Sequence, residues 1–164
     1  MRILSPNLIA AVFLVAGATA ASAYWDVTNS GEDVFGNVNV TATSIGDNGN
    51  IMKFECGSSS EPFLAFLLRD NSGDVPEIPA TFIHMDFAGV RHETPSTLGS
   101  WNENYVAVKV TDKPTLERVA DHMTAATTSI SVGVTVPSFE LRAADTFSSR
   151  GSTAAGRTLL ENCF

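Results

Sequence analysis

Two histidines and an aspartate lie close together in the middle of the sequence and have the chemistry of a metal site. His84 and Asp86 are two residues apart in a stretch with the two-residue apolar period of a β-strand, so both side chains lie on one face. His92 follows Ala88-Gly89, a pair that is typical of a turn. Two imidazoles and a carboxylate are ligands that zinc and iron accept.

The length of the turn decides whether these three side chains can meet. A three-residue turn brings them together, whereas a two-residue turn pairs Asp86 with Arg91 and His84 with Glu93. In the shorter turn His92 points to the opposite face. We favour the shorter turn because it sets opposite charges across from each other. A polar surface is therefore expected here, with a metal-dependent or other hydrolase using His84, Asp86 and His92 as the alternative.

Other catalytic and cofactor motifs are missing from the sequence. It has no Gly-x-Ser-x-Gly elbow, no phosphate-binding loop and no dinucleotide fingerprint. The third histidine, His122, is expected on the solvent side of a helix beside Asp121. We therefore expect no cofactor and favour a protein that is not an enzyme.

Three aromatic residues are the candidates for binding a partner. Trp25, Trp101 and Tyr105 belong to the residue types that are enriched in interface hot spots. The alternative interpretation places these rings in the hydrophobic core, which is the commoner location of such residues in a β-sandwich.

Most of the chain has the pattern of β-strands. In residues 51–56, Met52, Phe54 and Cys56 alternate with polar side chains, which predicts a half-buried strand with Cys56 inward. Pro137 ends the strand 130–136 or marks an edge, and residues 138–141 are expected to continue it. The expected strands are residues 24–28, 37–43, 51–56, 63–68, 81–87, 90–94, 105–110 and 130–136.

Two segments have the pattern of helices. The first follows Asp112 as a cap and repeats apolar residues at helical spacing up to Met123. The second is a short terminal helix, 152–163, with Ser152 as its N-cap. Many short strands with two small helices predict a mainly β fold. We expect an antiparallel β-sandwich or a curled sheet with two short helices, one at the C-terminus.

The first 23 residues have the composition of a cleaved signal peptide. Arg2 precedes an apolar run at 8–15, and Ala21-Ser22-Ala23 has the small-x-small pattern of a cleavage site. We expect residues 24–164 to form one exported β-rich domain, periplasmic or secreted, in a bacterial host. No stable membrane insertion is expected after cleavage.

The two cysteines and the charge fit this location. Cys56 and Cys163 predict one disulfide in an exported chain. Ten Lys and Arg against eighteen Asp and Glu give a net charge of −8, or nine minus eighteen, about −9, once Arg2 is removed. Such acidity argues against nucleic acid and anionic lipid as partners. It also motivates a further alternative, a secreted inhibitor of a basic enzyme such as lysozyme.

A spaced set of residues runs through the mature chain: Trp25, Asp33, Cys56, Trp101 and the tail Phe147, Gly151, Ala155, Leu159 and Cys163. The order of these residues resembles that of the VasI/TagO-like periplasmic accessory proteins of type VI secretion systems. Small exported proteins similar to invasion-associated protein B share the ending. The opening differs from the family's Ser-Pro-x-Asp-type run, with Asn29-Ser30-Gly31-Glu32-Asp33 in its place. The resemblance implies an envelope accessory protein that binds another protein, and it brings no catalytic residues.

Overall fold

The computed structural model describes residues 24–164 except 33–35, 59 and 70–77. The predicted signal peptide, Asp33 and the predicted loop 70–76 therefore lie outside the described residues. The strands are β1 (Asp26–Asn29), β2 (Asn39–Ile45), β3 (Ile51–Gly57), β4 (Ser60–Arg69), β5 (Ile78–Phe87), β6 (Val90–Asn102), β7 (Tyr105–Val110), β8 (Ile130–Val136) and β9 (Leu141–Phe147). The helices are α1 (Lys113–Ala125) and α2 (Ser152–Cys163), and a short 3₁₀ turn spans Pro137–Phe139.

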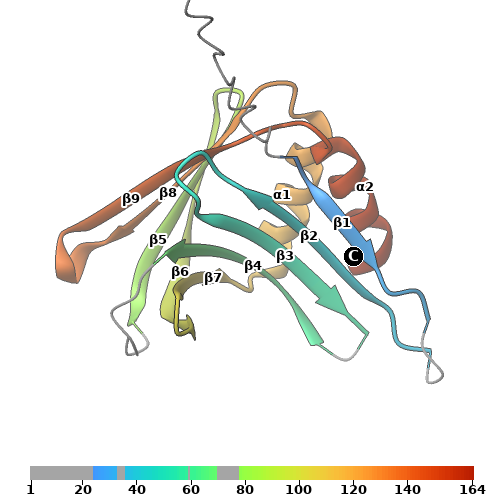
Figure 1. The fold of residues 1–164 in the computed structure, drawn as a ribbon, viewed down its shortest axis with the longest axis horizontal. Coiled ribbons are helices and arrows are strands. Elements are labelled where there is room, and N and C mark those ends of the chain that lie inside the picture. The colour runs from blue at the N-terminus through green and yellow to red at the C-terminus, as the bar shows by residue number, and fades with distance from the viewer. Residues whose placement is uncertain (1–23, 33–35, 59, 70–77) are drawn as a thin grey trace, which may run out of the picture.

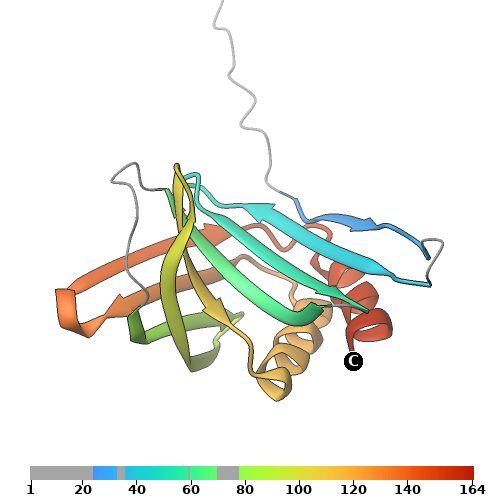
Figure 2. The same ribbon diagram turned by 90° about the horizontal axis from the view of Figure 1, so that it is seen from below.

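The strands form one antiparallel sheet in the order β1-β2-β3-β4-β7-β6-β5-β8-β9. The sheet is curled, and both helices lie on one side of it (Figures 1 and 2). We call the helix-covered side the inner face and the opposite side the outer face. The curled antiparallel sheet with two short helices, one of them C-terminal, confirms the predicted fold class.

Alternating side chains build the core between the sheet and the helices. On β3, Met52, Phe54 and Cys56 are buried on the inner face, as their two-residue period predicts. The apolar stripe of α1 packs against the sheet and against α2. Each fully buried Phe or Met contributes roughly 1.5–3 kcal/mol to folding. The buried residues of the α1 stripe are Thr115, Leu116, Val119, Ala120 and Met123.

The two helices begin in different ways. Asp112 caps α1 as predicted, since its carboxylate accepts a hydrogen bond from the Thr115 N–H at 3.0 Å. The hydrogen bonds from Thr115 lower the pKa of Asp112. The prediction for α2 was wrong: Gly151, not Ser152, is the N-cap. Gly151 has a φ of 83°, a left-handed conformation that glycine adopts without strain, and a Cβ there would lie 3.1 Å from the Trp25 carbonyl oxygen.

The predicted disulfide joins Cys56 of β3 to Cys163 at the end of α2, a separation of 107 residues. It fastens the terminal helix to the inner face of the sheet. A closed loop of this length stabilises the fold by about 4–5 kcal/mol in the chain-entropy model.

The chain after β8 departs from the prediction. Residues 138–141 do not continue the strand, because Pro137 opens a 3₁₀ turn and Glu140 adopts a left-handed φ of 52°. The chain then reverses into β9, which pairs antiparallel with β8. The sequence pattern did not predict β9, whose middle is Ala143-Ala144-Asp145, residues that are depleted in strands.

A buried aspartate explains this unusual strand. Asp145 is on the inner side of β9 and is 4% exposed. Its carboxylate accepts hydrogen bonds from the backbone N–H groups of Asn48 and Asn50, at 3.0 and 3.2 Å, in the turn between β2 and β3. The Asp47 N–H also donates to the Thr146 carbonyl at 3.1 Å. The curl of the sheet is therefore fixed where this turn meets β9.

Candidate functional site

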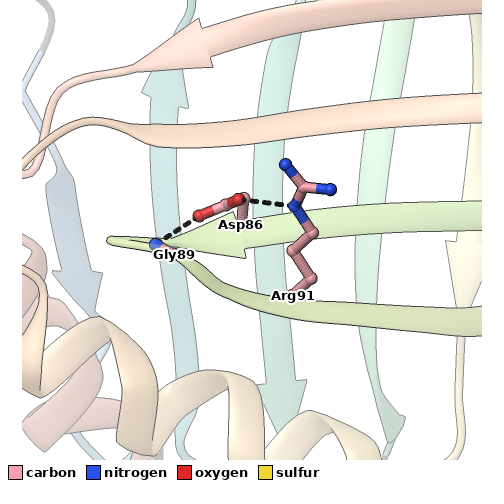
Figure 3. A network of polar contacts seen from close by, with 3 residues as sticks. All are labelled: Asp86, Gly89 and Arg91. Atoms are coloured by element: carbon pink, nitrogen blue, oxygen red, sulfur yellow. Dashed lines mark hydrogen bonds and ion pairs between the residues drawn. The ribbon is translucent and has the colours of Figure 1, made fainter.

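The hairpin of β5 and β6 has the shorter of the two turns considered. Ala88 and Gly89 have φ values of 55° and 92°, and Asp86 is opposite Arg91. Asp86 accepts a hydrogen bond from the Gly89 N–H at 2.6 Å and another from Arg91 Nε at 3.1 Å (Figure 3). These two hydrogen bonds lower the pKa of Asp86. The predicted register is confirmed.

This register separates the three residues of the metal-site alternative. His84 and Asp86 lie on the outer face, whereas His92 is opposite the buried Met85 and lies on the inner face. Among the described residues, no group of three or more His, Cys, Asp or Glu side chains is arranged to hold a metal ion. The geometry therefore does not assemble a metal site from His84, Asp86 and His92.

His92 instead meets His122 of α1, with ring centroids 4.5 Å apart. Phe87 stacks on His122 at 5.6 Å, so His122 is half-buried rather than on the solvent side as expected. Burial lowers the pKa of His92, and the nearby charges of His122 and Arg118 lower it further. This histidine pair lies at the contact between the sheet and α1.

His84 takes part in a row of polar contacts on the outer face. Its Nε2 is 3.0 Å from Thr135 Oγ1 and its Nδ1 is 3.3 Å from Glu93 Oε2. A hydroxyl, an imidazole and a carboxylate in a row have the order of a hydrolytic triad. However, β8 is paired on both sides, so its N–H groups are engaged in the sheet and do not form an oxyanion hole beside Thr135. We therefore interpret Thr135 and Glu93 as residues that hold the His84 ring in place, not as parts of a catalytic triad.

A shallow hollow lies beside part of this row, at His84 and Glu93. Its volume is about 600 Å³, and it opens over β5, β6, β8 and β9. We call it the polar basin and define it by His84, Asp86, Arg91, Glu93 and Gly133. Its charged groups pair across the hairpin, with Asp86 bonded to Arg91 and His84 to Glu93.

A second region of the outer face is apolar. Ala65, Leu67 and Ala107 are buried there, although they point away from the helices. Half-buried apolar side chains cover them, and the Phe63 and Trp101 rings lie 6.0 Å apart. We call this region the aromatic patch and define it by Ile51, Lys53, Phe63, Trp101, Tyr105 and Lys109.

Strand register brings the patch together. Lys53, Ala65 and Lys109 are opposite one another across β3, β4 and β7. The next row is Ile51, Leu67 and Ala107. The small side chains of the two alanines leave room for the rings above them. Trp101 comes from β6, the neighbour of β7, so the patch is a product of four neighbouring strands rather than of one motif.

Two lysines lie among the rings. The ammonium of Lys53 is 5.3 Å from the Trp101 centroid, and that of Lys109 is 5.0 Å from Phe63 and 5.2 Å from Trp101. Such cation–π contacts contribute about 0.5–1 kcal/mol at exposed sites. Lys53 is paired with Glu55, whereas no carboxylate of the described residues pairs with Lys109. The patch therefore carries a net positive charge on an acidic protein.

The three aromatic binding candidates divide between core and surface. Trp25 is 4% exposed, and its Nε1–H donates to the Ser148 carbonyl at 3.0 Å, so it belongs to the core. Trp101 and Tyr105 lie in the patch.

The sequence did not single out the other four members of the patch, Ile51, Lys53, Phe63 and Lys109. The signal was available: the continuous apolar run 63–68 places apolar side chains on both faces of β4, which indicates a strand covered on both sides.

Comparisons with protein-family models, curated proteins and solved structures find nothing that matches this chain. Within the described residues, neither helix has the length and apolar character required to span a bilayer.

Proposed function

We propose that this is a non-enzymatic exported protein that acts by binding another protein, and that the aromatic patch is its contact surface. The observation that carries the proposal is the patch itself: three aromatic rings and an isoleucine gathered on a sheet face that no described helix covers. The envelope accessory role implied by the resemblance to VasI/TagO-like proteins belongs to the same class of function.

The composition of the patch suits a protein partner. Interfaces are enriched in Trp, Tyr and Phe, and contiguous apolar patches on a monomer commonly mark interaction sites. A rigid sheet also holds the rings in place before binding, which reduces the entropy lost when a partner docks. Trp101 lies at the centre of the contacts, since Phe63, Lys53 and Lys109 all meet its ring.

Export is the second part of the proposal. The signal-peptide pattern of the first 23 residues supports it. The disulfide between Cys56 and Cys163 is compatible with a periplasmic or extracellular location, because thiols in the cytosol are kept reduced.

The test is capture of a partner from the envelope of the source bacterium after brief crosslinking. We expect one dominant envelope protein with the parent chain and its loss with Trp101→Ser. Phe82→Ser is the matched control, because Phe82 is an aromatic residue of the outer face on β5, outside the patch. Equal capture by the parent and Trp101→Ser, or no capture above background, would overturn the proposal.

A further inference from the structure

Gly99 is a glycine in the interior of β6 whose presence the fold does not require. Its φ lies outside the left-handed region, and a Cβ built on it would meet no heavy atom within 4 Å. Glycine weakens a strand because it gains conformational freedom in the unfolded chain and offers no side chain to pack. Other residues would therefore stabilise β6 better. The visible effect of the glycine is an open space on the outer face.

That space is a hollow of about 230 Å³ beside the aromatic patch. Gly99 and Ala107, which are opposite each other in the sheet, belong to its lining together with Thr97, Ser100 and Lys109. We call it the Gly99 hollow. Lys109 belongs to both regions, because it lines the hollow and its ammonium lies over the Phe63 and Trp101 rings.

Lys109 gives the hollow its chemical preference. Glu55 neutralises Lys53, and none of the described carboxylates does the same for Lys109. Low-dielectric rings beside an ammonium strengthen its attraction to an anion. The Thr97 hydroxyl, opposite Lys109 in the sheet, adds a hydrogen-bond donor to the lining.

We propose that the Gly99 hollow receives the carboxylate of an aspartate or glutamate in the partner's contact segment, while apolar neighbours of that residue lie on the patch. This inference rests on the proposed function and names the chemistry of the partner. The net charge of −8 repels acidic proteins in general. A single cation in an apolar setting therefore selects a partner with one well-placed acid rather than an acidic surface.

The test follows the Gly99 amide and the Trp101 indole by NMR during titration with blocked hexapeptides. One peptide has a central glutamate between tyrosine and valine, and the second has glutamine in its place. We expect the glutamate peptide to shift both signals and to bind about three- to fivefold more tightly, as for a partly exposed charge pair. The difference should shrink at high salt and vanish in Lys109→Gln.

Two glycine variants separate the hollow from the fold. Gly99→Thr places a side chain in the hollow, and we expect it to abolish the shift of the Trp101 indole signal while Tm stays the same or rises. Gly133→Thr is the matched control, because Gly133 is the outward glycine of β8 and a Cβ there makes only ordinary contacts, the nearest at 3.5 Å. This control should bind like the parent chain.

Equal binding of the two peptides, parent-like binding by Gly99→Thr, or the absence of any shift would overturn the inference. Shifts caused by a galacturonic acid hexamer and not by the glutamate peptide would also overturn it, in favour of an acidic sugar. These outcomes are distinct from failure of the proposed function. A partner whose capture depends on Trp101 but not on Lys109 would leave the binding function standing and remove the carboxylate subsite.

Discussion

The polar basin and the aromatic patch share the outer face of one sheet, yet they differ in how their side chains are satisfied. In the basin each charged group has a partner within the protein, Asp86 with Arg91 and His84 with Glu93. In the patch the rings cover only one another and three buried residues, Ala65, Leu67 and Ala107, and Lys109 has no described carboxylate beside it. Side chains that already have partners within the protein gain little binding free energy from a ligand, because the ligand must first replace those contacts.

The apolar patch, rather than the charged basin, is therefore the better candidate for a functional surface on this sheet. A cluster of titratable side chains attracts attention first, because histidines and carboxylates can do chemistry. Here that cluster is explained by cross-strand pairing in a hairpin. The apolar region is harder to explain by folding alone, since apolar area left beside water gives no stability. If the two regions differ in this way, variants of the patch and variants of the basin should have separate effects.

The largest expected effect is a loss of stability when the disulfide is removed. The structure of the patch should not change. Cys56→Ser with Cys163→Ser removes the disulfide, and we expect a loss of about 4–5 kcal/mol in the free energy of unfolding. Urea titration measures it. Because the disulfide lies on the inner face, the Trp101 indole signal should stay unchanged in the folded variant. A displaced indole signal would mean that the patch depends on the terminal helix.

The next effect is on binding. Trp101→Ser should lower the affinity for the partner by about 30-fold or more, the range of an interface hot spot, with little change in Tm. Tyr105 lies at the edge of the patch, so Tyr105→Ser should lower the affinity by a smaller factor. Isothermal titration with the captured partner gives both values. If Asp86→Ala lowers the affinity for the partner as much as Trp101→Ser does, the basin and the patch form one binding site and do not have different roles.

Much of the fold follows from local patterns in the sequence. The alternation in residues 51–56 predicts β3 and the inward Cys56. The charge pairs predict the register of the β5–β6 hairpin, because a shift by one residue would separate them. Asp112 predicts the start of α1. In each case neighbours in sequence carry the information.

The remainder depends on contacts between distant segments. Strand β9 has weak strand propensity and forms because Asp145 is bonded to the β2–β3 turn, some 95 residues earlier. The cap of α2 is a glycine because the Trp25 backbone lies against it. The patch forms from β3, β4 and β7 together with Trp101 of β6, so no single stretch reveals it. The residue types alone therefore indicated Trp101 and Tyr105 but not the surface that they share.

A smaller effect concerns pH and the inner-face histidine pair. The pKa of His92 is lowered in the folded protein, so the unfolded chain binds more protons at mildly acidic pH. Stability should therefore fall as the pH drops below about 6.5, the ordinary histidine pKa. His92→Gln should flatten this dependence, whereas His84→Gln in the basin should not. Urea midpoints measured from pH 7.5 to 5 would show it, and equal slopes for the two variants would contradict it.

The smallest expected effect is in the basin. Arg91→Gln removes the hydrogen bond from Arg91 to Asp86, but the Gly89 N–H still holds the carboxylate in the turn. The Arg91 side chain is 87% exposed, so its ion pair is screened by water and adds little to stability. We expect Tm and partner affinity close to those of the parent chain. Lys109→Gln removes the same charge from the patch and should weaken binding. Matched losses in these two variants would mean that overall charge, rather than the place of Lys109 among the rings, governs recognition.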